Sequence, residues 1–274
     1  MRFLVAADTQ LGLYSKLSET INDSLSKKWN SKIIDKFDFK NMKPTTSYEY
    51  EVNNLKKIIT SFDKNEYTFM TILGDLINDY NSEDQFLKFN NLIGKSKYKD
   101  KINLIPGNHD MNEPPDIYSK SIYNKRFGLD YYEKKYQNYK FLFLNSTILR
   151  NNQNLLSDYK KHIDLIRNSL NNYDHKLFIF MHHSLFYENF DEDLNKWNID
   201  KKVRYTIMQL LLNHQNEVYI FSGHLHKNKI TKYQNITNIT VSSVGVPFGN
   251  DPSGYYEVDI NNNSVNYKFI NIGD

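Results

Sequence analysis

Short apolar runs of strand length recur along the chain and alternate with longer segments that have the 3.6-residue period of amphipathic helices. Alternation of this kind favours parallel pairing in a buried sheet, whereas successive strands near the end of the chain favour antiparallel additions. The sequence therefore predicts an α/β fold. The runs span residues 3–7, 68–73, 102–105, 140–144, 177–181 and 218–221, and alternating strands follow at 239–244, 255–260 and 265–270.

The helical segments between these runs each carry an apolar face, and Asp200 precedes the last of them as a plausible N-cap. No linker or repeat interrupts the pattern, so we expect one domain over residues 1–274. The faces are formed by Leu55, Ile58, Ile59 and Phe62, by Leu165, Ile166 and Leu170, and by Val203, Ile207, Leu210 and Leu211.

A polar stretch at about 11–47 is long for a connection between a strand and its helix. It leaves the carboxyl end of a strand, where open α/β sheets bind ligands. Two interpretations stay open for this predicted loop insertion: a flap that faces the substrate and carries Trp29 and Phe37, or an insertion without function.

Composition limits the chemistry. The chain has no Cys, so a disulfide framework, a thiolate zinc site and a cysteine nucleophile are excluded, and any metal must be held by nitrogen and oxygen. Lys and Arg number 35 against 32 Asp and Glu, which indicates no nucleic-acid or anionic-membrane surface. The first apolar run is too short for a signal peptide, and no run is long enough to cross a bilayer. We expect a cytoplasmic protein.

Polar residues with metal-binding chemistry follow five of the predicted strands. Because the carboxyl ends of parallel strands meet at one edge of a sheet, we expect these side chains to converge. Imidazole, carboxylate and amide oxygen are ligands for Mn, Fe, Zn or Co, and an Asp between two such ions can bridge them. The residues are Asp8 and Gln10, Asp75, Asn108 with His109 and Asp110, His182 with His183, and His224 with His226.

Other polar and aromatic residues of the chain are interpreted as supporting, packing or surface residues. We expect His183 to support the ligands or to be structural, and Asp110 to be either a support for its neighbours or a turn residue. Tyr131 and Tyr132 are interpreted as packing residues because no basic stripe accompanies them. Histidines outside the motifs are predicted to lie at the surface: His162, His175 and His214.

The order Asp8-x-Gln10, Gly74-Asp75, Gly107-Asn108-His109-Asp110, His182 and Gly223-His224-x-His226 resembles the calcineurin-like metallophosphoesterase superfamily over almost the whole chain. Several segments are similar to the branch called complete serine/threonine phosphatase: 7–12, 74–77, 144–146, 221–228, 241–243 and 251–254. The resemblance implies an α/β/β/α sandwich of two mixed sheets flanked by helices.

The resemblance also implies roles. Two divalent or trivalent ions (Mn, Fe or Zn) would share Asp75 as a bridge, and a hydroxide between them would attack phosphorus. His109 would be the general acid at the leaving oxygen. The first ion would be held by Asp8, Gln10, Asp75 and His226, and the second by Asp75, Asn108, His182 and His224.

Two departures from the superfamily's common pattern affect the expected chemistry. Gln10 stands where His is usual, which predicts a weaker first metal and resembles the manganese-dependent ADP-ribose and CDP-alcohol diphosphatases. Asn78 and Asp79 stand where calcineurin-type phosphatases carry an Asp that orients the catalytic His and an Arg that grips phosphate. Asn78 could still hydrogen-bond His109 but cannot raise its pKa by charge. Arg204 is a candidate for the phosphate clamp, with a solvated helix charge as the alternative.

Three hypotheses for function remain from the sequence. The first is a serine/threonine phosphoprotein phosphatase, whose partner is a phosphorylated protein or a small phosphate ester. The second is a nucleotide diphosphate or phosphodiester hydrolase, which Gln10 favours. The third is a non-catalytic scaffold with a vestigial site, which the retained general acid His109 disfavours. A nuclease is disfavoured by the balanced charge.

Overall fold

Five strands form the first sheet, in the order β11-β10-β1-β2-β3. We describe residues 1–22, 45–261 and 264–273 of the computed structural model. Parallel pairing joins the first three strands in sequence, and two antiparallel strands extend the sheet beside β1. The strands are β1 (Arg2–Ala6), β2 (Phe69–Ile72), β3 (Ile102–Leu104), β10 (Gly254–Asn261) and β11 (Ser264–Asn271).

Six strands form the second sheet, in the order β4-β5-β6-β7-β9-β8. Its four inner strands are parallel, and antiparallel strands close both edges. The strands are β4 (Tyr132–Tyr136), β5 (Tyr139–Phe143), β6 (Leu177–Phe180), β7 (Val218–Ser222), β8 (Lys229–Tyr233) and β9 (Ile236–Thr240).

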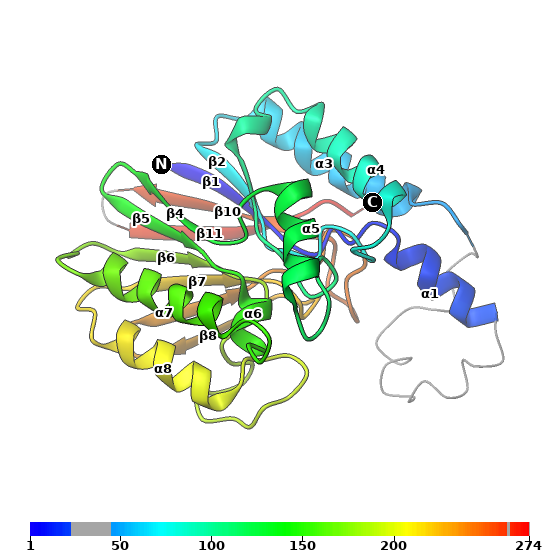
Figure 1. Cartoon of the computed structure of the whole chain (residues 1–274). Coiled ribbons are helices and arrows are strands. Elements are labelled where there is room, and N and C mark those ends of the chain that lie inside the picture. The colour runs from blue at the N-terminus through cyan, green and yellow to red at the C-terminus, as the bar shows by residue number, and fades with distance from the viewer. Residues whose placement is uncertain (23–44, 262–263, 274) are drawn as a thin grey trace.

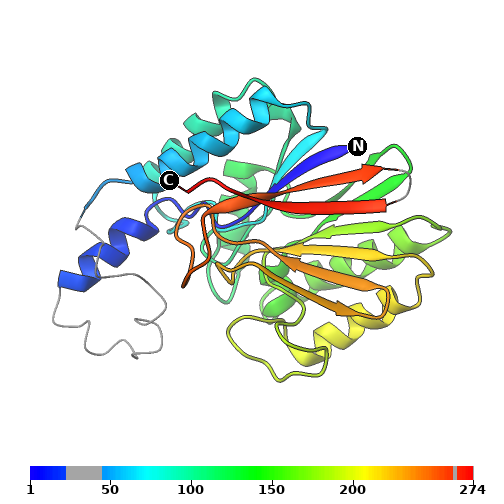
Figure 2. The ribbon, with the colours of Figure 1, turned by 180° about the vertical axis from the view of Figure 1, so that it is seen from behind.

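The two sheets pack face to face with helices on both outer sides, which confirms the predicted α/β/β/α sandwich (Figures 1 and 2). Alternation along β1 shows why. Phe3 and Val5 point into the core between the sheets, and the Phe3 ring stacks on Phe69 with centroids 4.7 Å apart. Leu4 and Ala6 point the other way, into the core beneath the helices. Both faces of the strand are therefore buried, as a continuous apolar run requires.

Helices cover the outer side of each sheet (Figure 1). The first sheet is covered by α3 (Glu49–Lys64), α4 (Glu83–Gly94) and α5 (Ile117–Phe127). The second is covered by α6 (Ser146–Arg150), α7 (Leu156–Leu170) and α8 (Lys201–Leu212). The predicted apolar face of α3 is fully buried. Asp200 caps α8 by accepting a hydrogen bond from the Lys202 backbone N–H, as predicted. None of the helices in the described ranges is long and apolar enough to span a membrane.

Some elements differ from the sequence prediction. The predicted loop at 11–47 begins with a helix, α1 (Leu13–Asn22), and Trp29 and Phe37 lie outside the described residues. The strand expected at 239–244 is β9, which covers Ile236–Thr240 and pairs in parallel with β7 on one side and antiparallel with β8 on the other. Strands β4 and β8 were not predicted because they lie at sheet edges, where half-buried and exposed residues alternate and no apolar run marks the strand.

Two histidines predicted to lie at the surface are buried. His162 is fully buried in α7, where Nδ1 donates to the Asp158 carbonyl at 2.7 Å and Nε2 accepts from the Asn145 backbone N–H at 3.2 Å. His214 is also buried, and its Nε2 bonds the His175 carbonyl at 2.8 Å. His162 satisfies both ring nitrogens with main-chain groups and His214 satisfies Nε2 in this way, which a sequence pattern does not show. His175 is exposed, as predicted.

Burial gives His162 a measurable effect on acid stability. Burial lowers the pKa of His162 below its ordinary value of 6.5. As pH falls through 6.5, His162 becomes protonated in the unfolded chain but stays neutral in the folded chain. The contribution of His162 to the free energy of unfolding is therefore present above pH 6.5 and is lost as pH falls below it. We expect His162→Gln, which keeps an acceptor for Asn145, to lose less unfolding free energy than the wild type between pH 7.5 and 5. Urea unfolding at several pH values measures this, and identical pH profiles would contradict it.

Candidate metal centre

The predicted ligand residues are delivered by the carboxyl ends of parallel strands from both sheets. Asp8 follows β1, Asp75 follows β2 and Asn108 follows β3, whereas His182 follows β6 and His224 follows β7. The two sheets meet along these ends because main-chain bonds tie the loops together. The Gly245 N–H, which follows β9 of the second sheet, donates to the Asp8 carbonyl at 2.9 Å, and the Val244 N–H donates to the Ala7 carbonyl at 2.9 Å.

Most of these residues have a strained backbone. Eight non-glycine residues in the described part of the chain have positive φ, a region that L-residues seldom occupy. Five of the eight are predicted ligands: Asp8, Gln10, Asp75, His224 and His226. Each such residue costs on the order of 1–2 kcal/mol, and strain of this kind persists where the surrounding structure imposes it, typically at functional sites. Backbone strain is therefore concentrated at the residues that the sequence motifs predicted as metal ligands.

Two glycines let the loops approach the carboxylates. A Cβ at Gly223 would lie 2.6 Å from Asp8 Oδ2, and a Cβ at Gly107 would collide with Asp75 Oδ1. The space that a side chain would fill is instead used by hydrogen bonds. The His224 N–H donates to Asp8 Oδ2 at 3.0 Å, and the His109 N–H donates to Asp75 Oδ1 at 2.9 Å. Both glycines are therefore required by close approach.

Side-chain oxygens and nitrogens converge between the strand ends. One ligand atom each from Asp8, Asp75 and His182 lies within 4.8 Å of the others, and all three side chains are buried. His182 Nε2 is 3.4 Å from Asp75 Oδ2 and 3.1 Å from Asn108 Oδ1. His226 Nε2 is 3.5 Å from Asp8 Oδ1. Spacings of this size suit donor atoms that share a cation.

Hydrogen bonds to main-chain carbonyls orient the imidazoles. Nδ1 of His182 donates to the Leu73 carbonyl at 2.8 Å, and Nδ1 of His226 donates to the Val246 carbonyl. In the neutral ring, Nε2 of each then carries the lone pair that faces the carboxylates. His224 is turned the other way because its Nε2 bonds the Lys196 carbonyl at 2.8 Å, so its Nδ1 carries the lone pair.

Gln10 provides a direct test of whether the residues fit a metal. Its side chain is 2% exposed, and Oε1 has no hydrogen-bond partner among the described residues. A buried amide oxygen without a partner costs about 1–3 kcal/mol, so it is retained where something accepts its lone pair. Its backbone N–H donates to the Asp75 carbonyl at 2.8 Å, which places it beside the cluster. An oxygen ligand at this position fits a cation.

The electrostatics of the cluster also call for a cation. Burial raises the pKa of Asp8 well above its ordinary value. Burial lowers the pKa of His224 to about 3 and that of His226 to about 4. Burial also opposes the charge of His182, but the Asp75 and Asp8 carboxylates outweigh it and raise the pKa of His182 to about 9. A metal ion at the centre would offset the buried negative charge that raises the pKa of His182.

His109 lies beside this cluster with one ring nitrogen fixed. Nδ1 donates to the Asn78 main-chain carbonyl at 2.8 Å, so Nε2 is the nitrogen available for proton transfer. The sequence reasoning considered the Asn78 side chain for this contact, but the backbone makes it. The neighbouring Asp110 is buried and accepts from the Leu76, Ile77 and Gly107 N–H groups. Burial raises the pKa of Asp110 to about 7. Asp110 therefore joins two ligand loops and is more than a turn residue.

Arg204 lies in a position that neither sequence interpretation anticipated. The side chain is fully buried, and its guanidinium donates to the Phe190 carbonyl at 3.0 Å and to the Glu192 carbonyl at 2.7 Å. It is therefore neither a solvated helix charge nor available to clamp phosphate. Its contacts hold the segment between β6 and α8 in place.

Glu51 is a supporting residue that sequence reasoning missed. This buried side chain of α3 accepts hydrogen bonds from the Gly12 N–H at 3.2 Å and the Tyr14 N–H at 2.7 Å, at the start of α1. It thereby fixes the segment that follows Gln10. A capping carboxylate supplied from 37 residues away in sequence leaves no local signature.

Removing the Glu51 carboxylate should destabilise the contact between α3 and the start of α1. We expect Glu51→Ala to lower the free energy of unfolding by about 1–3 kcal/mol, because one buried and one partly buried N–H donor lose their acceptor. Glu51→Gln keeps one acceptor oxygen and should lose less. Denaturant unfolding of both variants measures the difference, and equal losses would show that side-chain volume rather than hydrogen bonding matters.

The fold and the converging ligands together define a metallophosphoesterase. Residues 1–228 match the family described as calcineurin-like phosphoesterase, and the chain belongs to this family, which hydrolyses phosphoric esters at a dinuclear metal centre. This confirms the family and enzyme class predicted from the sequence.

Curated relatives and solved structures extend the comparison. The chain is 23% identical to the mouse serine/threonine-protein phosphatase CPPED1 over 280 residues, covering 99% of this chain and 84% of the relative. The human protein of that name is 23% identical over 281 residues, with the same coverage. A dimetal phosphatase from Danio rerio has a TM-score of 0.64 at 13% identity, covering 98% of this chain and 95% of that one. Yellow lupin purple acid phosphatase PPD1 has a TM-score of 0.66 at 13% identity, covering 98% and 51%. The solved structures establish the fold.

Proposed function

We propose that the protein is a serine/threonine phosphoprotein phosphatase with a binuclear metal centre. The observation that carries the proposal is the buried convergence of Asp8, Asp75 and His182 at the shared edge of the two sheets. The substrate class is supported by the curated relatives, which are named as serine/threonine-protein phosphatases. The cytoplasmic location expected from the sequence forms part of this proposal.

The ligand assignment is the one that the family resemblance implies, and the convergence of Asp8, Asp75 and His182 supports it. Asp8, Gln10, Asp75 and His226 would hold one ion, and Asp75, Asn108, His182 and His224 would hold the other. A donor set made only of nitrogen and oxygen suits Mn, Fe or Zn. When bound, two such ions supply an activated water and neutralise charge on the phosphoryl oxygens.

The protein's own groups account for orientation and proton transfer. The His109 main-chain N–H holds Asp75 Oδ1 at 2.9 Å, while its imidazole is fixed through the Asn78 carbonyl. Nε2 can therefore protonate a leaving alkoxide without disturbing the carboxylate. A serine or threonine alkoxide is a poor leaving group and needs this proton.

A second candidate function, hydrolysis of a nucleotide diphosphate, is favoured by aromatic rings beside two of the predicted ligands. The Phe248 ring stacks on His226 with centroids 4.3 Å apart, and the Trp197 ring lies 5.7 Å from that of His224. Both aromatic side chains are partly exposed. An aromatic surface at a phosphate site suits a nucleobase.

A metal-by-substrate screen separates the two functions. Protein loaded with Mn, Fe or Zn would be assayed on phosphoserine and phosphothreonine peptides, an aryl phosphomonoester, a bis-aryl phosphodiester and ADP-ribose. We expect the highest kcat/KM on the phosphopeptides. A higher value on ADP-ribose would favour the second function, and hydrolysis of none of them by any metal form would contradict both.

A further inference from the structure

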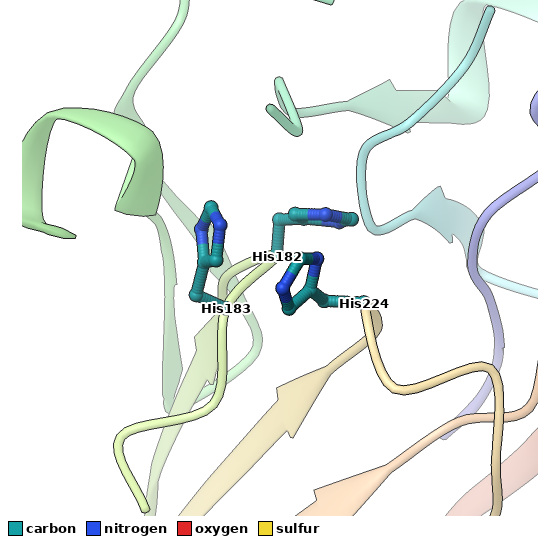
Figure 3. A group of neighbouring side chains, drawn as sticks. All are labelled: His182, His183 and His224. Atoms are coloured by element: carbon teal, nitrogen blue, oxygen red, sulfur yellow. The ribbon is translucent and has the colours of Figure 1, made fainter. Parts of the chain in front are cut away.

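His183 is a buried imidazole at the metal centre to which the proposed ligand sets assign no role. It directly follows His182, and its side chain has no exposed surface. Its ring centroid lies 4.4 Å from that of His224 and 4.9 Å from that of His182. Figure 3 shows the three imidazoles gathered around one point, with the α6 side of the group occupied by His183.

The Ser146 hydroxyl determines which ring nitrogen of His183 carries the proton. Ser146 Oγ accepts the backbone N–H of His182 at 3.0 Å and that of His183 at 2.7 Å, which uses both of its lone pairs. Its own hydrogen is then directed to His183 Nδ1, 3.1 Å away. Nδ1 is therefore the acceptor, and the proton of the neutral ring is on Nε2.

The consequence is a buried N–H donor beside the metal ligands. Nε2 has no hydrogen-bond partner among the described residues, and it is closed to bulk water. An atom that carries a proton cannot ligate a metal, although the grouping of three imidazoles alone would allow it. An unsatisfied donor costs about 1–3 kcal/mol, and an oxygen held inside the centre would satisfy it by accepting its hydrogen.

Two arginine side chains in the described part of the chain that could be considered for binding the phosphate group are already engaged by main-chain carbonyls. Arg204 binds two main-chain carbonyls, and Arg150 donates to the Asn195 and Asn198 carbonyls. A neutral N–H donor at the centre can bind an anionic oxygen without adding a buried charge.

We propose that His183 is a substrate-binding residue whose Nε2–H donates to a phosphoryl oxygen, with Ser146 as the positioning residue that fixes its tautomer. The proposal rests on the phosphoesterase function above and adds the residue that recognises the phosphate group. It predicts that His183 affects the binding of phosphate and does not affect the binding of metal.

A matched pair of variants tests the proposal. The Gln amide can place an N–H where imidazole Nε2 lies, whereas the shorter Asn amide reaches only the Nδ1 position. The dissociation constant of inorganic phosphate for the manganese-loaded protein would be measured by calorimetry, together with manganese content. We expect His183→Asn to weaken phosphate binding about ten- to hundredfold, the value of a hydrogen bond to a charged group. His183→Gln should stay within about threefold of the wild type.

The outcomes are distinct. Equal phosphate affinity in wild type and His183→Asn, or loss of manganese from both variants, would overturn the proposal, and the second result would make His183 a metal ligand. Nδ1 protonation of His183 in a histidine 15N spectrum of the metal-free protein would also overturn it. His214→Asn, a buried histidine at the far end of the sheet, should leave phosphate affinity unchanged. If the wild type itself binds no phosphate, the phosphoesterase proposal fails together with this one.

Discussion

Asp75→Asn should abolish hydrolysis of an aryl phosphate, with kcat/KM falling at least about a thousandfold. The side chain is the one carboxylate that the proposal places between both ions, and Oδ2 lies 3.4 Å from His182 Nε2. An amide keeps the shape of the side chain and an acceptor for the His109 N–H, but it removes the charge that two cations share. Metal ions supply several kcal/mol of transition-state stabilisation, and each 1.4 kcal/mol is a factor of ten in rate.

Metal content distinguishes this effect from misfolding. We expect bound manganese to fall in Asp75→Asn while the circular dichroism spectrum stays that of the wild type. Asp164→Asn removes a charge of the same sign from an exposed i,i+3 ion pair on α7 and should leave both activity and metal content unchanged. Full activity in Asp75→Asn would exclude the two-metal proposal.

The predicted ligands could be found from the sequence because each one lies in a local motif next to a strand. Asp75 and Asn108 follow glycines that permit close approach, and the strand before Asp75 is recognisable as a buried apolar run. Parallel strands then bring their carboxyl ends to one edge whatever the details of the loops. The α/β class and the convergence of these residues were therefore predicted from the strand pattern, whereas the two-sheet sandwich and the division of the ligands between two ions were implied by the resemblance to the metallophosphoesterase superfamily.

The supporting residues could not be found in this way, since their partners are distant in sequence. Ser146 bonds the backbone of His183 across 37 positions, and Glu51 caps α1 across 37 positions. Arg204 has the exposed-helix pattern of a surface charge, yet it is fully buried because two carbonyls of the preceding loop accept its guanidinium. Such contacts depend on how loops fold back onto helices, which neither hydrophobic period nor composition encodes.

His109→Ala should reduce hydrolysis in proportion to the need for a proton at the leaving oxygen. On phosphoserine and phosphothreonine peptides we expect a loss of about a hundred- to ten-thousandfold, the usual contribution of a general acid, and on an aryl phosphate only a few-fold loss. The substitution leaves the ligand sphere intact because Asp75 is held by the main-chain N–H of residue 109, not by its ring. Metal content should therefore match the wild type.

The measurement is kcat/KM across phosphate esters of graded leaving-group pKa. The variant should show a steeper dependence of kcat/KM on leaving-group pKa than the wild type. If log kcat/KM fell with leaving-group pKa at the same slope in variant and wild type, the imidazole would bind or orient the substrate. Another group at the centre would then have to be the general acid.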